Sequence, residues 1–110
     1  MNFKDAIFKM AKQPLPPTPY TCPITHTQAY VKNFTVAERE QYSLAVSGAK
    51  DGLANATAFV NIVCDEQGHL IFEQKDVETV AKLPEDVVLA AIREFNNKPD
   101  LTLKDVQKNS

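Results

Sequence analysis

The chain has 110 residues, which is room for one domain with a modest hydrophobic core. Apolar residues make up 44% of it and charged residues 24%, the balance of an ordinary globular protein. The net charge of -2 provides no field that could hold phosphate backbones, so nucleic-acid binding through bulk electrostatics is disfavoured.

Neither a membrane span nor a secretory signal is predicted. No apolar run approaches the length that would cross a bilayer. The first eleven residues mix Lys4, Asp5 and Lys9 with apolar residues, whereas a signal peptide needs a continuous apolar block. The two cysteines, Cys22 and Cys64, are compatible with reduced thiols. We therefore expect a cytoplasmic protein with no membrane partner.

Residues 1–12 predict an amphipathic helix, because Phe3, Ile7 and Met10 recur at i, i+4 and i+7. A helix of this length is marginal alone, so its apolar face needs a surface to cover it. Two interpretations stay open. Either the helix folds back onto its own domain, or Phe3, Ile7 and Met10 are anchors for a partner protein.

A proline-rich spacer is predicted over residues 13–19, which contain four prolines. Such a segment forms neither helix nor central strand and favours a stiff, extended conformation. It divides the N-terminal helix from a domain expected over residues 20–98. A flexible tail is expected over residues 99–110, where few apolar side chains remain to bury.

The first half of the domain predicts a hairpin followed by a helix. Residues 20–34 are rich in Thr, Tyr, Val and Ile, with a turn near residues 26–28 and a second strand over 29–34. Thr35 and Glu38 have the spacing of a capping box, so a helix begins there and runs to about residue 46. At the position that packs on Phe34, Arg39 offers only its aliphatic stem.

The second half predicts three more helices and a short strand. An apolar stripe over residues 53–64 indicates a central helix, ended by the turn at residues 65–68. Residues 69–72 are expected to form a strand that pairs with residues 29–34. Helices over residues 75–83 and 84–96 follow, the second beginning at a proline. The predicted fold class is α+β: a mostly helical single domain of four to five helices with a small antiparallel sheet or hairpin.

The sharpest chemical candidate is a metal site. Cys22 with His26, and Cys64 with His69, supply two cysteines and two histidines of the kind that bind tetrahedral zinc. Neither pair has the tight C-x2-C spacing of specific zinc sites, and Cys64 falls on an apolar stripe, where a free cysteine behaves as a small hydrophobe. A small Cys2His2 zinc-bound domain is kept as an alternative.

No catalytic constellation emerges from the sequence. No motif surrounds either cysteine, the acidic pair Asp65 and Glu66 lacks the pattern of a calcium loop, and the three glycines form no phosphate-binding loop. We predict a non-enzymatic protein with no cofactor.

Two segments together resemble the tail assembly chaperone family of long-tailed (lambda-like) phages and prophages. The first is residues 29–42, AYVKNFTVAEREQY, with a strand, a capping threonine and a helix opening Ala-Glu-Arg. The second is residues 60–96, where an apolar helix, an Asp-Glu-x-Gly turn, Leu-x-Phe, an Asp-Val helix, Leu-Pro and a last helix occur in the family's order. Residues 1–28 have no counterpart in the resemblance.

The resemblance implies a chaperone that binds and shields the tape measure protein while the tail tube is assembled. It also implies action in the host bacterial cytoplasm and absence from the mature virion. The tail tube protein and further copies of the chain are additional candidate partners. The alternative from a different class is a small phage or host interaction adaptor.

Overall fold

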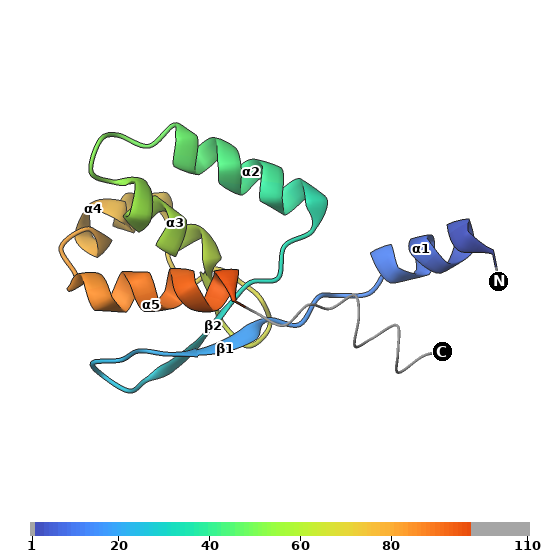
Figure 1. Ribbon diagram of the computed structural model, residues 1–110, viewed down its shortest axis with the longest axis horizontal. Helices are drawn as coiled ribbons and strands as arrows, with labels where there is room; N and C mark the ends of the chain where they lie inside the picture. Colours follow the sequence, from blue (N-terminus) through green and yellow to red (C-terminus); the bar gives the residue numbers. More distant parts are fainter. Residues whose placement is uncertain (1, 98–110) are drawn as a thin grey trace.

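The computed structural model describes residues 2–97 and confirms the α+β class, with five α-helices and one three-stranded antiparallel sheet among those residues (Figure 1). The predicted tail, residues 99–110, lies outside the described residues. In chain order the elements are α1 Phe3–Ala11, β1 Thr18–Thr21, β2 Gln28–Val31, α2 Val36–Ser47, α3 Ala54–Ile62, β3 Val63–Cys64, a 3-10 turn η1 Gln74–Asp76, α4 Val77–Val80 and α5 Glu85–Asn96.

The sheet has the strand order β1-β2-β3, and both pairs are antiparallel. β1 begins at Thr18, inside the predicted proline spacer, and Pro19 pairs with Tyr30. Proline is tolerated there because β1 is an edge strand, where one side of the backbone needs no ladder partner. The hairpin loop is longer than predicted, and β2 ends at Val31 instead of residue 34.

Two predictions around the third strand are wrong. The central helix ends at Ile62 instead of Cys64, because Val63 turns to an extended backbone with ψ 128°. Val63 then pairs with Val31, and both residues of β3 are buried. The expected strand over residues 69–72 makes only an isolated bridge, between Leu70 and Cys64, since β3 occupies the place beside β2.

α3 lies at the centre of the domain, between α2 and α5 (Figure 1). Six of its nine residues are buried, and Ile62 is fully so. α5 contributes Val88, Ala91 and Phe95 to the same core, as its helical spacing predicts. The helix predicted over residues 75–83 is shorter, being a 3-10 turn followed by one turn of α-helix.

The predicted start of α2 is confirmed in detail. The Thr35 hydroxyl accepts the Glu38 backbone N–H at 3.2 Å, and the Glu38 carboxylate accepts the Thr35 N–H at 2.9 Å. This reciprocal capping box satisfies two donors that the first helical turn leaves unpaired.

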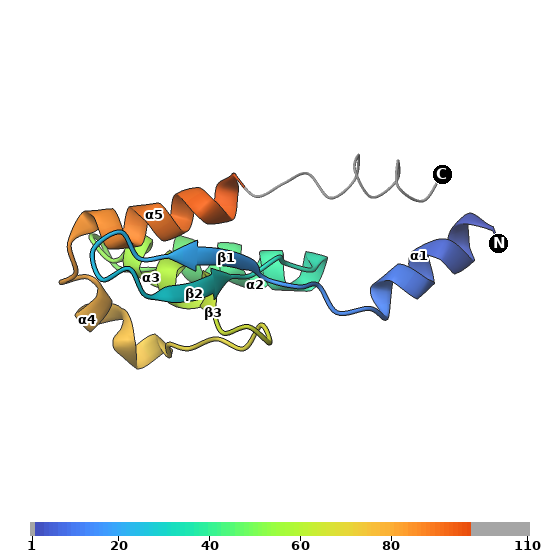
Figure 2. The ribbon, with the colours of Figure 1, turned by 90° about the horizontal axis from the view of Figure 1, so that it is seen from below.

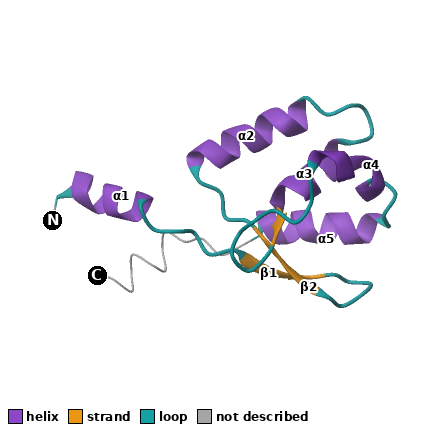
Figure 3. Ribbon diagram, turned by 180° about the vertical axis from the view of Figure 1, so that it is seen from behind, coloured by secondary structure: helices purple, strands orange, loops and turns teal. Residues whose placement is uncertain are grey.

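α1 is held away from the domain at the end of an extended arm, so the interpretation that it folds back is wrong (Figures 1, 2 and 3). None of its residues is buried. The Asn33 amide donates to the Pro16 carbonyl, which fixes the arm to the domain beside β2. Between residues 2 and 97, no helix is long and apolar enough to cross a membrane.

Candidate protein-binding surface

The predicted anchors Phe3, Ile7 and Met10 lie on one face of α1. The Asn2 side chain caps this helix by accepting the Asp5 backbone N–H at 2.9 Å. Asp5 in the first turn and Lys9 in the last suit the helix dipole, which favours helix formation without support from the domain. The three anchors are 80%, 40% and 62% exposed, so the helix has an apolar face that the domain does not cover.

Phe8 is the fourth large apolar side chain of α1, but it belongs to the other side of the helix. At 3.6 residues per turn it lies about 140° from Phe3. The Lys4 ammonium lies 5.6 Å from the centre of the Phe8 ring, a cation–π contact. Phe8 is therefore a natural reference residue: equally apolar, also exposed, and off the proposed contact face.

A second apolar feature is a groove of about 220 Å³ between α2 and the residues that follow β3. It is smaller than the ~300–1,000 Å³ of typical ligand pockets, so it suits the insertion of side chains from a protein segment. Leu70 is 44% exposed at its edge. The lining residues are Lys32, Phe34, Ala37, Glu38, Gln41, Tyr42, Asn61 and Leu70.

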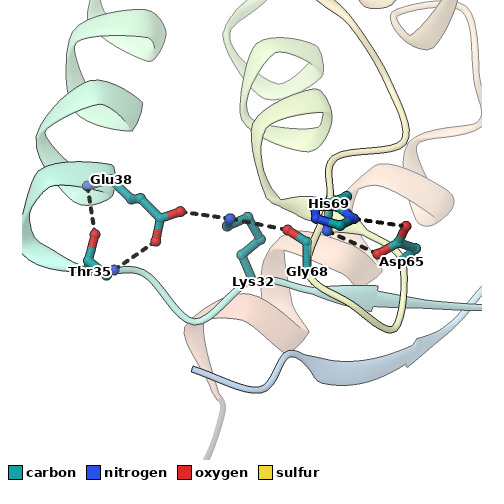
Figure 4. A network of polar contacts seen from close by, with 6 residues as sticks. All are labelled: Lys32, Thr35, Glu38, Asp65, Gly68 and His69. Carbon is teal, nitrogen blue, oxygen red and sulfur yellow. Dashed lines mark hydrogen bonds and ion pairs between the residues drawn. The ribbon is translucent and has the colours of Figure 1, made fainter. Parts of the chain in front are cut away.

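Lys32 lines this groove and joins its two sides through polar contacts (Figure 4). Its ammonium lies 2.7 Å from Glu38 Oε2 and donates to the Gly68 carbonyl at 3.2 Å, joining α2 to the turn after β3. The hydrogen bond from Lys32, followed by that from the Thr35 backbone, holds the pKa of Glu38 below its usual range. The Glu38 carboxylate is therefore ionised at neutral pH, where it pairs with the Lys32 ammonium.

An aromatic cluster forms the support behind the groove. Phe34, Tyr42 and Phe95 pack with ring centres 5.0–5.6 Å apart. The Arg39 guanidinium lies over all three rings, at 5.4, 5.5 and 5.1 Å from their centres. Arg39 thus contributes its charged head as well as its stem, which fixes α2 against α5.

The residues of the zinc alternative do not form a metal site. Across residues 2–97, no group of three or more His, Cys, Asp or Glu side chains could hold a metal ion. Cys64 is fully buried, and burial raises its pKa to about 11. His69 is exposed beside Asp65, whose carboxylate accepts backbone N–H groups from Gln67 and His69 (Figure 4). These hydrogen bonds within the turn at residues 65–68 explain the position of Asp65 without a metal ion.

Larger hollows also lie on the described part of the chain. One, of about 380 Å³, lies against the proline arm and shares Lys32 and Glu38 with the groove. Another, of about 450 Å³, lies between the end of α2 and α4. The sequence does not predict the groove, because the strand expected over residues 69–72 places Leu70 in the sheet, whereas Leu70 lines the groove. The signal in the sequence is the apolar pair Leu70-Ile71, which follows the turn glycine Gly68 after one residue. Both side chains are about half exposed.

Comparisons with models of known protein families, with curated proteins and with solved structures gave no match.

Proposed function

We propose that this protein is a non-enzymatic tail assembly chaperone of a phage or prophage, which binds and shields the tape measure protein during tail tube assembly. The observation that carries the proposal is α1: an amphipathic helix with uncovered anchors, held off the domain by a proline arm. The resemblance in residues 29–42 and 60–96 supplies the identity of the partner.

The physical logic is one of shielding. A long helical tape measure exposes apolar surface that aggregates when unprotected. Phe3, Ile7 and Met10 form an i, i+4, i+7 set, the arrangement by which an amphipathic helix packs against apolar helical surface. Nine residues bury little area, so each contact is weak, and many copies along one tape measure supply the strength.

The proposal is tested by pull-down of the tape measure protein with the full chain and with a variant lacking residues 1–12. We expect the truncation to lose the tape measure. Because α1 buries no residue, the truncation changes the unfolding free energy by less than about 0.5 kcal/mol, which separates lost binding from lost folding. Undiminished binding by the truncated chain contradicts the assignment of α1.

Gene order distinguishes the chaperone proposal from the alternative of an interaction adaptor. The chaperone proposal requires a tail-tube gene upstream and a long tape-measure gene downstream. A gene in any other neighbourhood favours an interaction adaptor, for which α1 would remain the contact surface.

A further inference from the structure

We propose that the groove between α2 and Leu70 is covered by the C-terminal segment of the same chain, which docks there with Leu101 and Leu103. This segment begins at residue 98 and lies outside the described residues. Once docked, it covers the groove of the free protein, and a partner segment reaches the groove only by displacing it. The groove is thereby regulated separately from the contact face of α1.

The groove has apolar walls and the size for an extended segment. Ala37 and Tyr42 line it from α2, and Leu70 lines it from the other side with 44% of its surface exposed. Its volume of about 220 Å³ takes a few side chains. A helix with its side chains is about 10 Å across and does not fit such a space.

The backbone at Leu70 is able to pair with one more extended segment. Leu70 bridges Cys64, but the hydrogen bonds of this bridge come from neighbouring residues, as from the Ile71 N–H to the Val63 carbonyl at 3.4 Å. Antiparallel pairing alternates, so the N–H and C=O of Leu70 point away from β3. Among the described residues, neither group makes a backbone hydrogen bond. Such an unpaired edge is a template for an added strand.

α5 brings the C-terminal segment to the groove. The helix ends at Asn96. The Phe95 ring lies 5.0 Å from the Phe34 ring and 5.6 Å from the Tyr42 ring, and these two partners also line the groove. The end of α5 therefore lies beside the connection from β2 to α2 (Figure 1). Leu103 follows Asn96 by seven residues, a reach of up to about 23 Å, which is enough to cross the groove.

The sequence of the segment suits an added strand. Residues 100–104 read Asp-Leu-Thr-Leu-Lys, in which polar and apolar residues alternate. In an extended chain, Leu101 and Leu103 share one side and Thr102 takes the other. Pairing along Leu70 turns both leucines toward the groove. Because the segment is tethered to α5, its effective concentration there is about millimolar, so burial of two side chains is enough for docking.

The test is hydrogen exchange of single backbone amides in the full chain, followed by NMR. The Leu70 N–H should exchange slowly, because the docked segment accepts its hydrogen bond. Leu103→Asp should raise this exchange rate by about tenfold, since the segment is released. Thr102→Asp places the same charge on the opposite side and should leave the rate slow. The Asp65 N–H, bonded to the His69 carbonyl, is the internal reference and should exchange equally in every variant.

A second pair of variants tests the groove itself. Ala37→Arg places a long side chain in the groove and should raise the exchange rate of the Leu70 N–H as Leu103→Asp does. Val36→Arg is its control, since Val36 is 81% exposed and does not line the groove. Both positions are exposed, so α2 should form in each variant.

The outcomes that overturn the proposal are distinct. In the wild type, a Leu70 N–H that exchanges as fast as in an unfolded peptide excludes docking. Slow exchange that Leu103→Asp or Ala37→Arg leaves unchanged, or that Thr102→Asp removes equally, excludes the assigned contact. Slow exchange that is lost on dilution places a second copy in the groove instead of the chain's own segment.

Discussion

The Lys32 ammonium lies 2.7 Å from the Glu38 carboxylate and ties the end of β2 to the first turn of α2. Glu38 therefore serves the capping box and the ion pair together. Glu38→Gln keeps the cap, since glutamine also accepts the Thr35 N–H, but removes the charge. We expect a loss below about 1 kcal/mol at pH 7, because Glu38 is more than a third exposed and solvent screens the pair.

The stabilising effect of Glu38 should depend on pH. The pKa of Glu38 is lowered in the folded state, so its contribution is present above the unfolded value of about 4.3. It disappears as the pH falls through the folded pKa. Urea midpoints should differ between wild type and Glu38→Gln at pH 7 and converge in acid. Glu40→Gln, on the same helix, is the control and should follow the wild type throughout.

Arg39 is expected to stabilise the fold through its contacts with three aromatic rings. Arg39→Ala removes a guanidinium that lies over Phe34, Tyr42 and Phe95, and should cost about 1 kcal/mol, the range for cation–π contacts at exposed positions. Arg39→Lys should recover part of this loss, because an ammonium keeps the charge without the planar stacking. Urea unfolding at fixed pH measures both. Equal stability of all three proteins would show that the rings alone fix α2.

Tyr20 joins the edge strand to the last helix, since its hydroxyl donates to the Val87 carbonyl at 2.7 Å. Tyr20→Phe should lose about 1 kcal/mol. Burial, with a smaller effect of Cys22, raises the pKa of Tyr20 to about 12. Because this value exceeds the unfolded value of about 10, wild-type stability falls between these pH values. Tyr20→Phe should fall less steeply in the same titration of the unfolding free energy; parallel curves would contradict the assignment.

The two thiols should react at very different rates. Hydrogen bonding from Thr25 lowers the pKa of Cys22, which is partly exposed, whereas Cys64 is fully buried with a raised pKa. Iodoacetamide at pH 8 should label one site per native chain quickly and the second only on unfolding. Cys22→Ser should abolish the fast phase. Fast labelling of both thiols would place Cys64 outside the core.

The sequence predicts those structural features that depend on residues close together in the chain. The capping box at Thr35 and Glu38 located the start of α2 because its hydrogen bonds join groups three residues apart. Periodicity could not decide whether Val63 and Cys64 belong to a helix or to a strand. Both residues are buried, and a short apolar run fits a buried helix as well as a buried strand.

For the candidate surface, too, only the part that depends on local spacing can be predicted from the sequence. The anchor face of α1 follows from spacing alone. The groove depends on Leu70 lining the same hollow as Ala37 and Tyr42 of α2, and Arg39 lies over the ring of Phe95 from a distant helix. No local pattern carries such contacts.

Binding of the tape measure by α1 is tested most directly by calorimetric titration of an apolar helical segment of the tape measure into three proteins. These are the wild type, Ile7→Asp and Phe8→Asp, which place the same charge on opposite sides of α1. The wild type and Phe8→Asp should bind, and Ile7→Asp should lose about 2 kcal/mol of binding free energy, the size of a binding hot spot. Equal affinity of all three proteins, or no binding by the wild type, would contradict binding through this face of α1.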